Sequence, residues 1–411
     1  MKALDGLHSP RLIALQQQLQ NNNSAAIVSF WQELEAQGTP LVEPQNDGQS
    51  LVTLVWRDEE KHTPGELTCS LGGILNSRSM APVLFQLYES NLWYRTFLLP
   101  GNVRATYHFF VNNQPVSDPL SKHTLTIPPN AVSVYGKQEM KLGIVELPDA
   151  EADIWSQQKP ETPQGKLHTQ LFSSTLVGHD YRLSVYTPHS YSSNGAPYPL
   201  LLLYDEWTHT TSIPAPTILD NMIAAGEIPP VVAVLFGHIQ RDGRMREMAF
   251  YEPFFACVKE ELLPYILQHY SVTHDSALTT VAGASMGGIA AMYSGLRYPE
   301  LFGNVYSHTG SSHGGPPEER AYPRFEQEIQ KHASTNQRFY LDVGMLEIDE
   351  MGCGSPDGGL NAVQSNRYMR NVLQAEGYVV TYVEYAGGHD MLWGGATLAD
   401  GLKALLNIHR R

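Results

Sequence analysis

The sequence has few cysteines, and those it has are far apart. Cys69, Cys257 and Cys353 are the three among 411 residues. An odd number at such wide spacing does not fit a disulfide framework or a zinc site. We therefore expect reduced thiols and no structural metal.

Positive charge is also scarce. The chain has 27 Lys and Arg against 42 Asp and Glu, a formal net charge of −15 at pH 7. A field of this sign repels nucleic acid and anionic membranes, so neither is an expected partner. An anionic small molecule would need a local positive patch to bind.

Long apolar runs are missing as well. No run approaches the roughly 20 residues that span a bilayer, and the first residues lack the charged-then-apolar pattern of a secretory signal. We therefore expect a cytoplasmic protein. Hydrophobic residues make up 42% and charged residues 17%, which is typical of globular proteins, and 411 residues predict two domains.

The first 150 residues predict a small all-β domain preceded by helices. Residues 9–37 show helical periodicity in two pieces. Short β-branched and aromatic runs between turn formers then predict strands of a β-sandwich. These runs are Leu51–Arg57, Val83–Tyr88, Leu92–Leu98 and Ala105–Val111. None carries a catalytic grouping, so we expect this domain to serve packing or substrate presentation.

Composition changes between about 118 and 165, where Pro, Gln, Ser and acidic residues dominate. We interpret this stretch as a linker and place the domain boundary at 151–166. From 167 to 411, apolar runs alternate with helical stretches at 249–270, 288–298, 359–376 and 396–409. This alternation predicts a mostly parallel, doubly wound sheet covered on both faces. The predicted strands are Tyr181–Pro188, Tyr198–Tyr204, Val231–Phe236, Leu278–Ala282, Phe339–Val343 and Val379–Tyr385.

Ser285 lies in a G-x-S-x-G pattern between a predicted strand and a predicted helix. At such a sharp turn the hydroxyl stands clear of the sheet, and Gly283 and Gly287 let the neighbouring main chain approach closely. Ser285 is therefore the candidate nucleophile. The amide of Met286 is the candidate oxyanion donor beside it.

A serine nucleophile needs a histidine base, and His389 is the preferred one among 16 histidines. It follows the last predicted strand after two glycines, which let a loop deliver the imidazole to the nucleophile. His308 and His313 follow an earlier strand and are candidates for lining the pocket.

The third member should be a carboxylate in the loop after Phe339–Val343. Glu347 is preferred there and Asp349 is the alternative, whereas Asp342 lies within the strand and should point away from the histidine. Asp390, adjacent to His389, is badly placed to orient its ring. The order serine, acid, histidine is that of α/β-hydrolases. A second oxyanion amide is expected after Tyr198–Tyr204, at Glu206 or Trp207.

Taken together, these residues resemble the enterochelin (enterobactin) esterase branch of the α/β-hydrolases, including that family's N-terminal β-sandwich domain. The resemblance covers nearly the whole chain. It rests on segments such as Val52-Thr-Leu-Val-Trp-Arg, Ile228-Pro-Pro-Val-Val, Arg244-Met-Arg-Glu-Met, Gly283-Ala-Ser-Met-Gly-Gly, Pro299-Glu-Leu-Phe-Gly and Gly387-Gly-His-Asp.

The resemblance implies hydrolysis of the trilactone of a catecholate siderophore, with iron present only as part of the substrate and no other cofactor. The family's nucleophile falls on Ser285, its histidine on His389 and its acid on Glu347. Arg244 falls on the arginine of an R-x-x-E segment, where it would hold substrate or anchor the loop through Glu247.

The departures from the family pattern concern the substrate. Ser312-His-Gly-Gly-Pro-Pro stands where the family commonly has an aromatic cluster. Candidate substrate-binding residues are Arg241, Arg244, Arg246, His313 and Trp393. Two alternatives stay open: a hydrolase or acyltransferase acting on another ester or thioester (feruloyl-type, polyketide or peptidyl), and a ligand-binding protein without catalysis.

Overall fold

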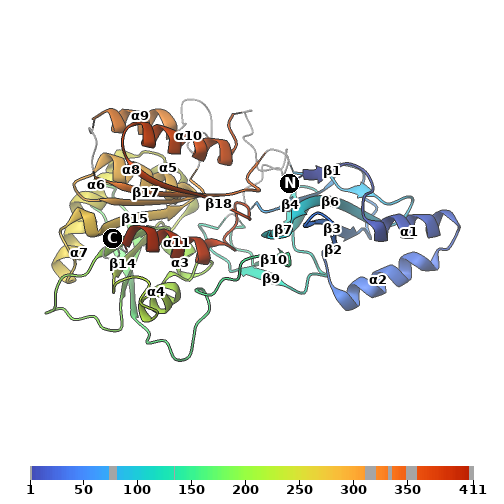
Figure 1. The fold of residues 1–411 in the computed structure, drawn as a ribbon, viewed down its shortest axis with the longest axis horizontal. Coiled ribbons are helices and arrows are strands. Elements are labelled where there is room, and N and C mark those ends of the chain that lie inside the picture. Colours follow the sequence, from blue (N-terminus) through green and yellow to red (C-terminus); the bar gives the residue numbers. More distant parts are fainter. Residues whose placement is uncertain are drawn as a thin grey trace.

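The computed structural model describes residues 2–73, 81–133, 135–310, 321–331, 336–348 and 359–406. In Figure 1 the N-terminal strands, blue to cyan, lie beside a larger sheet built from the rest of the chain. The two parts are in direct contact, because the core of the first includes side chains from the second.

The N-terminal part is a sandwich of two antiparallel sheets. One has the order β1-β6-β3-β2 with β5 on β6, and the other β4-β7-β10-β9 with β8 on β7. Alternating apolar side chains such as Leu54 and Phe97 meet Leu71 and Phe109 between the sheets, which confirms the predicted architecture. The strands are β1 Lys2–Leu4, β2 Leu41–Pro44, β3 Gln49–Arg57, β4 Leu67–Leu71, β5 Phe85–Gln86, β6 Leu92–Pro100, β7 Arg104–Val111, β8 Gln114–Val116, β9 Thr124–Ile127 and β10 Met140–Glu146.

Two helices cover the outer face of the first sheet, α1 Pro10–Gln20 and α2 Ala25–Gln37. The Ser9 hydroxyl accepts from Leu12 N and caps α1, which has Pro at its first position. Phe30 and Trp31 of α2 pack with Tyr94 of the sheet. The two predicted N-terminal helices are therefore present.

The C-terminal part is one eight-stranded sheet in the order β11-β12-β14-β13-β15-β16-β17-β18. All pairings from β14 to β18 are parallel, whereas β12 is antiparallel to both of its neighbours. The predicted mostly parallel sheet is thus confirmed. Its strands are β11 Lys166–Ser173, β12 Asp180–Thr187, β13 Leu200–Tyr204, β14 Val232–Gly237, β15 Thr279–Ala284, β16 Asn304–His308, β17 Arg338–Gly344 and β18 Val379–Tyr385.

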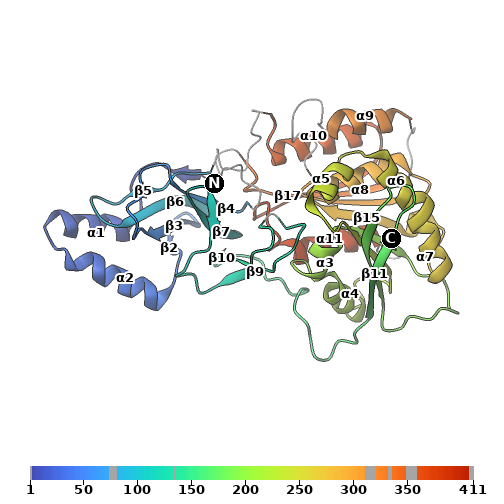
Figure 2. The ribbon, with the colours of Figure 1, turned by 180° about the vertical axis from the view of Figure 1, so that it is seen from behind.

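Helices cover both faces of this sheet (Figures 1 and 2). The face with α6 to α10 buries one apolar cluster, and the face with α4 and α11 buries another. Within the described ranges, no helix has both the length and the apolar character needed to cross a bilayer. The helices are α3 Glu206–Thr210, α4 Ala215–Ala224, α5 Arg241–Glu247, α6 Glu252–Cys257, a π-helix Val258–Leu262, α7 Leu263–His269, a 3₁₀ turn Ser276–Leu278, α8 Met286–Arg297, α9 Ala321–Lys331, α10 Ala362–Ala375 and α11 Gly394–Leu406.

One prediction about these elements is wrong. The stretch from 118 to 165 is not all linker, because β9 and β10 lie in it; the segment between β10 and β11, residues 147–165, holds no helix or strand. The helical stretch predicted at 249–270 is present from Glu252 to His269 as α6, a π-helical turn and α7; the π-helical turn lies ahead of Pro264, whose ring nitrogen has no N–H to donate. Strand β11 directly follows this linker and was not predicted. The boundary at 151–166 stays a prediction.

Candidate active site

Ser285 lies on the turn between β15 and α8 with φ 57° and ψ −119°, a strained backbone for a residue other than glycine. A Cβ on Gly283 would lie 2.3 Å from Gly287 O, so only glycine fits there. Ser285 N donates to His308 O at 2.8 Å, which ties the turn to β16. The glycines and the turn thus place Oγ at the carboxyl end of the sheet, as the sequence predicted.

His389 and Glu347 complete a chain of hydrogen bonds with the serine. His389 Nε2 lies 3.0 Å from Ser285 Oγ, and His389 Nδ1 lies 2.7 Å from Glu347 Oε2. The other oxygen of Glu347 accepts from Gly344 N at 2.9 Å, and the carboxylate is 1% exposed. The carboxylate therefore fixes the imidazole with Nδ1 protonated and Nε2 free to take a proton from the serine.

Asp205, which directly follows β13, forms a buried ion pair with Arg244 of α5. Nε and Nη2 of the arginine donate to the two carboxylate oxygens, each at 2.6 Å. Burial acts to raise the pKa of Asp205, but the charge and hydrogen bonds of Arg244 outweigh it and hold that pKa below its usual value. Asp205 itself has φ 65°. The pair therefore pins a strained turn beside the nucleophile helix, where a Cβ on Gly287 would lie 2.8 Å from Asp205 Oδ2.

The two residues after this turn, Glu206 and Trp207, line the same pocket as Ser285. The Glu206 carboxylate points into the protein, where it accepts from Ser184 Oγ at 2.7 Å and pairs with Arg182 Nε at 3.0 Å. In this segment the main-chain N–H groups, and not the Glu206 carboxylate, could therefore donate hydrogen bonds to an oxyanion. Met286 begins α8, where the first N–H groups lack intrahelical partners. The assignment of these amides as oxyanion donors stays a prediction.

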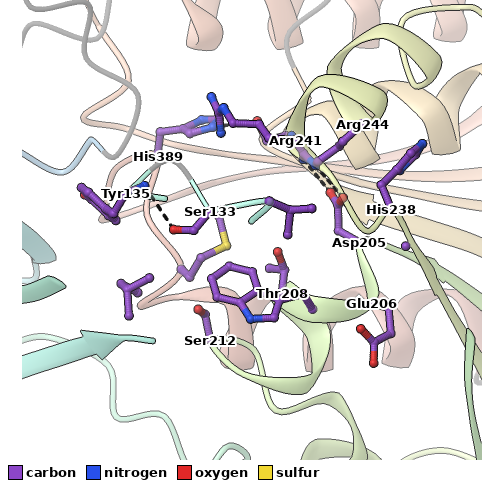
Figure 3. A pocket seen from close by; sticks show the side chains of 16 residues that line it. Ser133, Tyr135, Asp205, Glu206, Thr208, Ser212, His238, Arg241, Arg244 and His389 are labelled. Atoms are coloured by element: carbon purple, nitrogen blue, oxygen red, sulfur yellow. Dashed lines mark hydrogen bonds and ion pairs between the residues drawn. The ribbon is translucent and has the colours of Figure 1, made fainter. Parts of the chain in front are cut away.

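The pocket around Ser285 has walls from both parts of the chain. Figure 3 shows Ser133 and Tyr135 of the N-terminal part on one side, and Asp205 and Arg244 on the other. Arg241 also lines it, and within the described part of the chain it has no ion-pair partner. Burial, and then the nearby charge of Arg244, lower the pKa of Arg241. Among the described residues that line the pocket, Arg241 is thus an arginine without an ion-pair partner.

Three of the predicted binding residues make contacts other than those expected. Arg244 anchors its loop through Asp205 and not through Glu247. Arg246 is the arginine that pairs with Glu247, at 2.7 Å, and its side chain, 65% exposed, lies outside the pocket. Trp393 is buried between the two parts of the chain, and its Nε1 donates to Arg104 O.

The remaining candidates either do not line this pocket or fall outside the described residues. His313, Asp349 and Cys353 fall outside the described residues. His308 is buried and pairs with Asp342 at 2.6 Å, away from the pocket. Cys69 and Cys257 are buried free thiols. Among the described residues no group of three or more His, Cys, Asp or Glu is arranged to hold a metal ion, and the expectation of no cofactor stays a prediction.

Sequence reasoning missed several residues that line this site. Asp205 could have been found from its place directly after a buried parallel strand, where reactive groups gather. The wall formed by Ile127, Val132, Ser133 and Tyr135 gave no signal, because it depends on how the sandwich packs against the larger sheet.

Comparisons with known proteins bear on the whole chain. A family model described as "Putative esterase" matches residues 173–405. The iron(III) enterobactin esterase of Dickeya dadantii is 26% identical over 417 residues, 92% of each chain. The iron(III) salmochelin esterase of Escherichia coli O6:H1 is 25% identical over 97% of this chain and 98% of its own.

A solved structure gives the same picture of the fold. The enterobactin esterase from Shigella flexneri, crystallised in the presence of enterobactin, is 23% identical with a TM-score of 0.71. It covers 92% of this chain and 98% of its own. This similarity confirms the predicted arrangement of a β-sandwich and an α/β-hydrolase sheet.

Proposed function

The chain belongs to the putative esterase family whose model matches residues 173–405. On that premise we propose that it is a serine esterase that cleaves the ester bonds of a catecholate siderophore. The observation that carries the proposal is the hydrogen-bonded chain from Ser285 through His389 to Glu347. Its curated relatives named above are iron(III) enterobactin and salmochelin esterases, which supports a siderophore as the substrate.

The geometry supports a two-step acyl transfer. Ser285 Oγ attacks the ester carbonyl while Nε2 of His389 takes its proton, and Glu347 stabilises the imidazolium through Nδ1. Nε2 then gives the proton to the departing alkoxide, which leaves as an alcohol. Water, activated by the same nitrogen, releases the acyl group. The amides of Met286 and of residues 205–207 are the proposed donors to the oxyanion.

Arg241 is the proposed contact for the charge of the substrate. Because Asp205 neutralises Arg244, the positive potential in the pocket comes from Arg241. A catecholate bears negative charge, and a protein of net charge −15 would otherwise repel it. Trp207 and Tyr135 offer aromatic surface to its rings. We place the reaction in the cytoplasm, with iron entering only as part of the substrate.

Mass spectrometry of reaction products tests the substrate. The wild-type protein is incubated with enterobactin, with its ferric complex and with p-nitrophenyl butyrate. We expect catecholyl-serine products from the siderophore and none with Ser285→Ala. Brisk cleavage of p-nitrophenyl butyrate without catecholyl-serine products would refute the siderophore substrate and leave the esterase intact.

The variant Arg241→Met tests whether Arg241 binds the negative charge of the substrate. Losing a charge-assisted contact of about 1.5 kcal/mol should raise KM for the ferric complex about tenfold, with little change for uncharged p-nitrophenyl butyrate. Arg370→Met, which removes the same charge from the surface of α10, is the matched control. Equal effects of the two variants on KM for the ferric complex would refute a specific role for Arg241.

A further inference from the structure

The loop that carries His389 is docked on the edge of a strand in the N-terminal sandwich. Strand β4 ends at Leu71, opposite Tyr107 of β7. Beyond that point the amides of Arg104 and Thr106, two residues apart and so on the same edge of β7, donate to Ala386 O at 3.0 Å and to a carboxylate oxygen of Asp390 at 2.9 Å. The histidine loop therefore occupies the position that a longer β4 would fill.

Asp390, the residue next to the histidine, makes the polar part of this contact. Its carboxylate is fully buried and accepts from Thr106 N, from Thr106 Oγ1 at 3.1 Å and from Leu392 N at 3.0 Å. A buried carboxylate is costly unless such donors satisfy it. Asp390 is thus fixed to β7 while the ring of His389 is held by Glu347.

The main chains also meet directly. Gly73 and His389 form a parallel β-bridge, and a Cβ on Gly388 would lie 1.7 Å from Gly72 O. Leu346, adjacent to Glu347, is buried in the core of the sandwich. Both loops that deliver triad side chains therefore rest on the N-terminal part.

We propose that Asp390 and Thr106 form a clamp through which the β-sandwich positions His389 for proton transfer with Ser285, an inference that rests on the proposed esterase function. The clamp acts through the backbone of the histidine loop and touches no substrate, so these are positioning residues. The distance it maintains is the 3.0 Å from Nε2 to Oγ. A shift of about 1 Å at a catalytic group costs about 100-fold in rate.

The test compares Asp390→Ala and Thr106→Val with matched controls in the full-length chain. Asp118→Ala removes another buried carboxylate with three donors, and Thr96→Val removes another buried threonine hydroxyl of the sandwich. The readouts are kcat and KM for p-nitrophenyl butyrate and the rate of Ser285 labelling by a fluorophosphonate. Circular dichroism and thermal melting monitor folding.

We expect Asp390→Ala to lower kcat and the labelling rate about 100-fold with KM nearly unchanged, and Thr106→Val to lower them about tenfold. Thr106→Ser, which keeps the hydroxyl, should recover most of the loss. The controls should lower Tm without this loss of kcat. If Asp390→Ala does not fold, the pair Thr106→Val and Thr106→Ser decides.

Two outcomes separate the clamp from the esterase function. Wild-type kcat in folded Asp390→Ala or Thr106→Val, or an equal loss in the controls, would overturn the clamp. In either case, abolished turnover in Ser285→Ala would leave the esterase function standing. Turnover that survives in Ser285→Ala would instead refute Ser285 as the nucleophile on which the proposed esterase mechanism rests.

Discussion

The buried ion pair between Asp205 and Arg244 gives a prediction whose size follows from its geometry. The two side chains are 7% and 15% exposed, and both N–O distances are 2.6 Å. Asp205→Asn keeps the shape of the side chain and tolerates the φ of 65° at this position, so it removes the charge with little added backbone strain. It leaves Arg244 buried without a counter-ion.

Removing one partner of a buried pair costs about 3–5 kcal/mol. For a sheet domain of this size, about 3 kcal/mol lowers Tm by about 6–12 °C. The turn at residues 205–207 should also move, so kcat/KM should fall by at least about tenfold. Differential scanning calorimetry and turnover of p-nitrophenyl butyrate measure the two effects.

The control is an ion pair of equal geometry on the surface. Arg367 and Glu384 form two N–O contacts of 2.6 and 2.7 Å, with side chains 52% and 21% exposed. Glu384→Gln should cost less than about 1 kcal/mol. The double variant Asp205→Asn, Arg244→Met should regain part of the lost stability, because no unpaired charge stays buried.

The same pair adds a pH dependence. The folded-state pKa of Asp205 lies below its unfolded value of about 3.9, so its stabilisation is present above that pH and is lost as pH falls towards the folded pKa. In Asp205→Asn the free energy of unfolding should therefore fall less steeply as the pH is lowered through this range. A Tm within about 2 °C of wild type, an unchanged kcat/KM and an unchanged dependence of stability on acid pH would refute the role of the ion pair.

Three further predictions concern other buried groups. Glu347→Gln should lower kcat for p-nitrophenyl butyrate about 10³-fold or more with little change in KM, because the amide no longer stabilises the imidazolium; a kcat near wild type would exclude Glu347 as the acid. Glu247 accepts from four side chains, which overcome the effect of burial and hold its pKa far below the usual range. Glu247→Gln should cost about 3 kcal/mol in urea unfolding at pH 7, and a cost below about 1 kcal/mol would contradict this. Burial raises the pKa of Cys69 and Cys257 to about 12. In the Cys353→Ser variant, the native protein should therefore not react with Ellman's reagent at pH 8, whereas two thiols should react in urea. Fast labelling of the native variant would show that these thiols are accessible.

Periodicity and local motifs predicted most strands of the C-terminal sheet and the positions of Ser285 and His389. Ser285 and His389 stand in short segments whose glycines dictate the backbone. Two candidate acids, Glu347 and Asp349, follow the same predicted strand, and the family resemblance favoured Glu347. The order of strands and the turn at Ser285 then bring the serine, the histidine and Glu347 together.

Contacts between segments that are distant in the sequence could not be predicted from periodicity and local motifs. Arg244 has Glu247 three residues away on its own helix, yet its partner is Asp205, because strands β13 and β14 are neighbours in the sheet. Trp393 follows the histidine closely but turns towards the sandwich. The strands β9 and β10 were hidden in a polar, proline-rich stretch, because sheet pairing outweighed local composition.

The central claim is that Ser285 forms a covalent acyl intermediate. Acid quenching of a reaction with p-nitrophenyl butyrate within milliseconds, followed by peptide mapping in a mass spectrometer, tests it directly. We predict a butyryl adduct on the peptide that contains Ser285, absent from Ser285→Ala, which should also lose turnover. An adduct on another residue, or turnover by Ser285→Ala at the wild-type rate, would contradict the account.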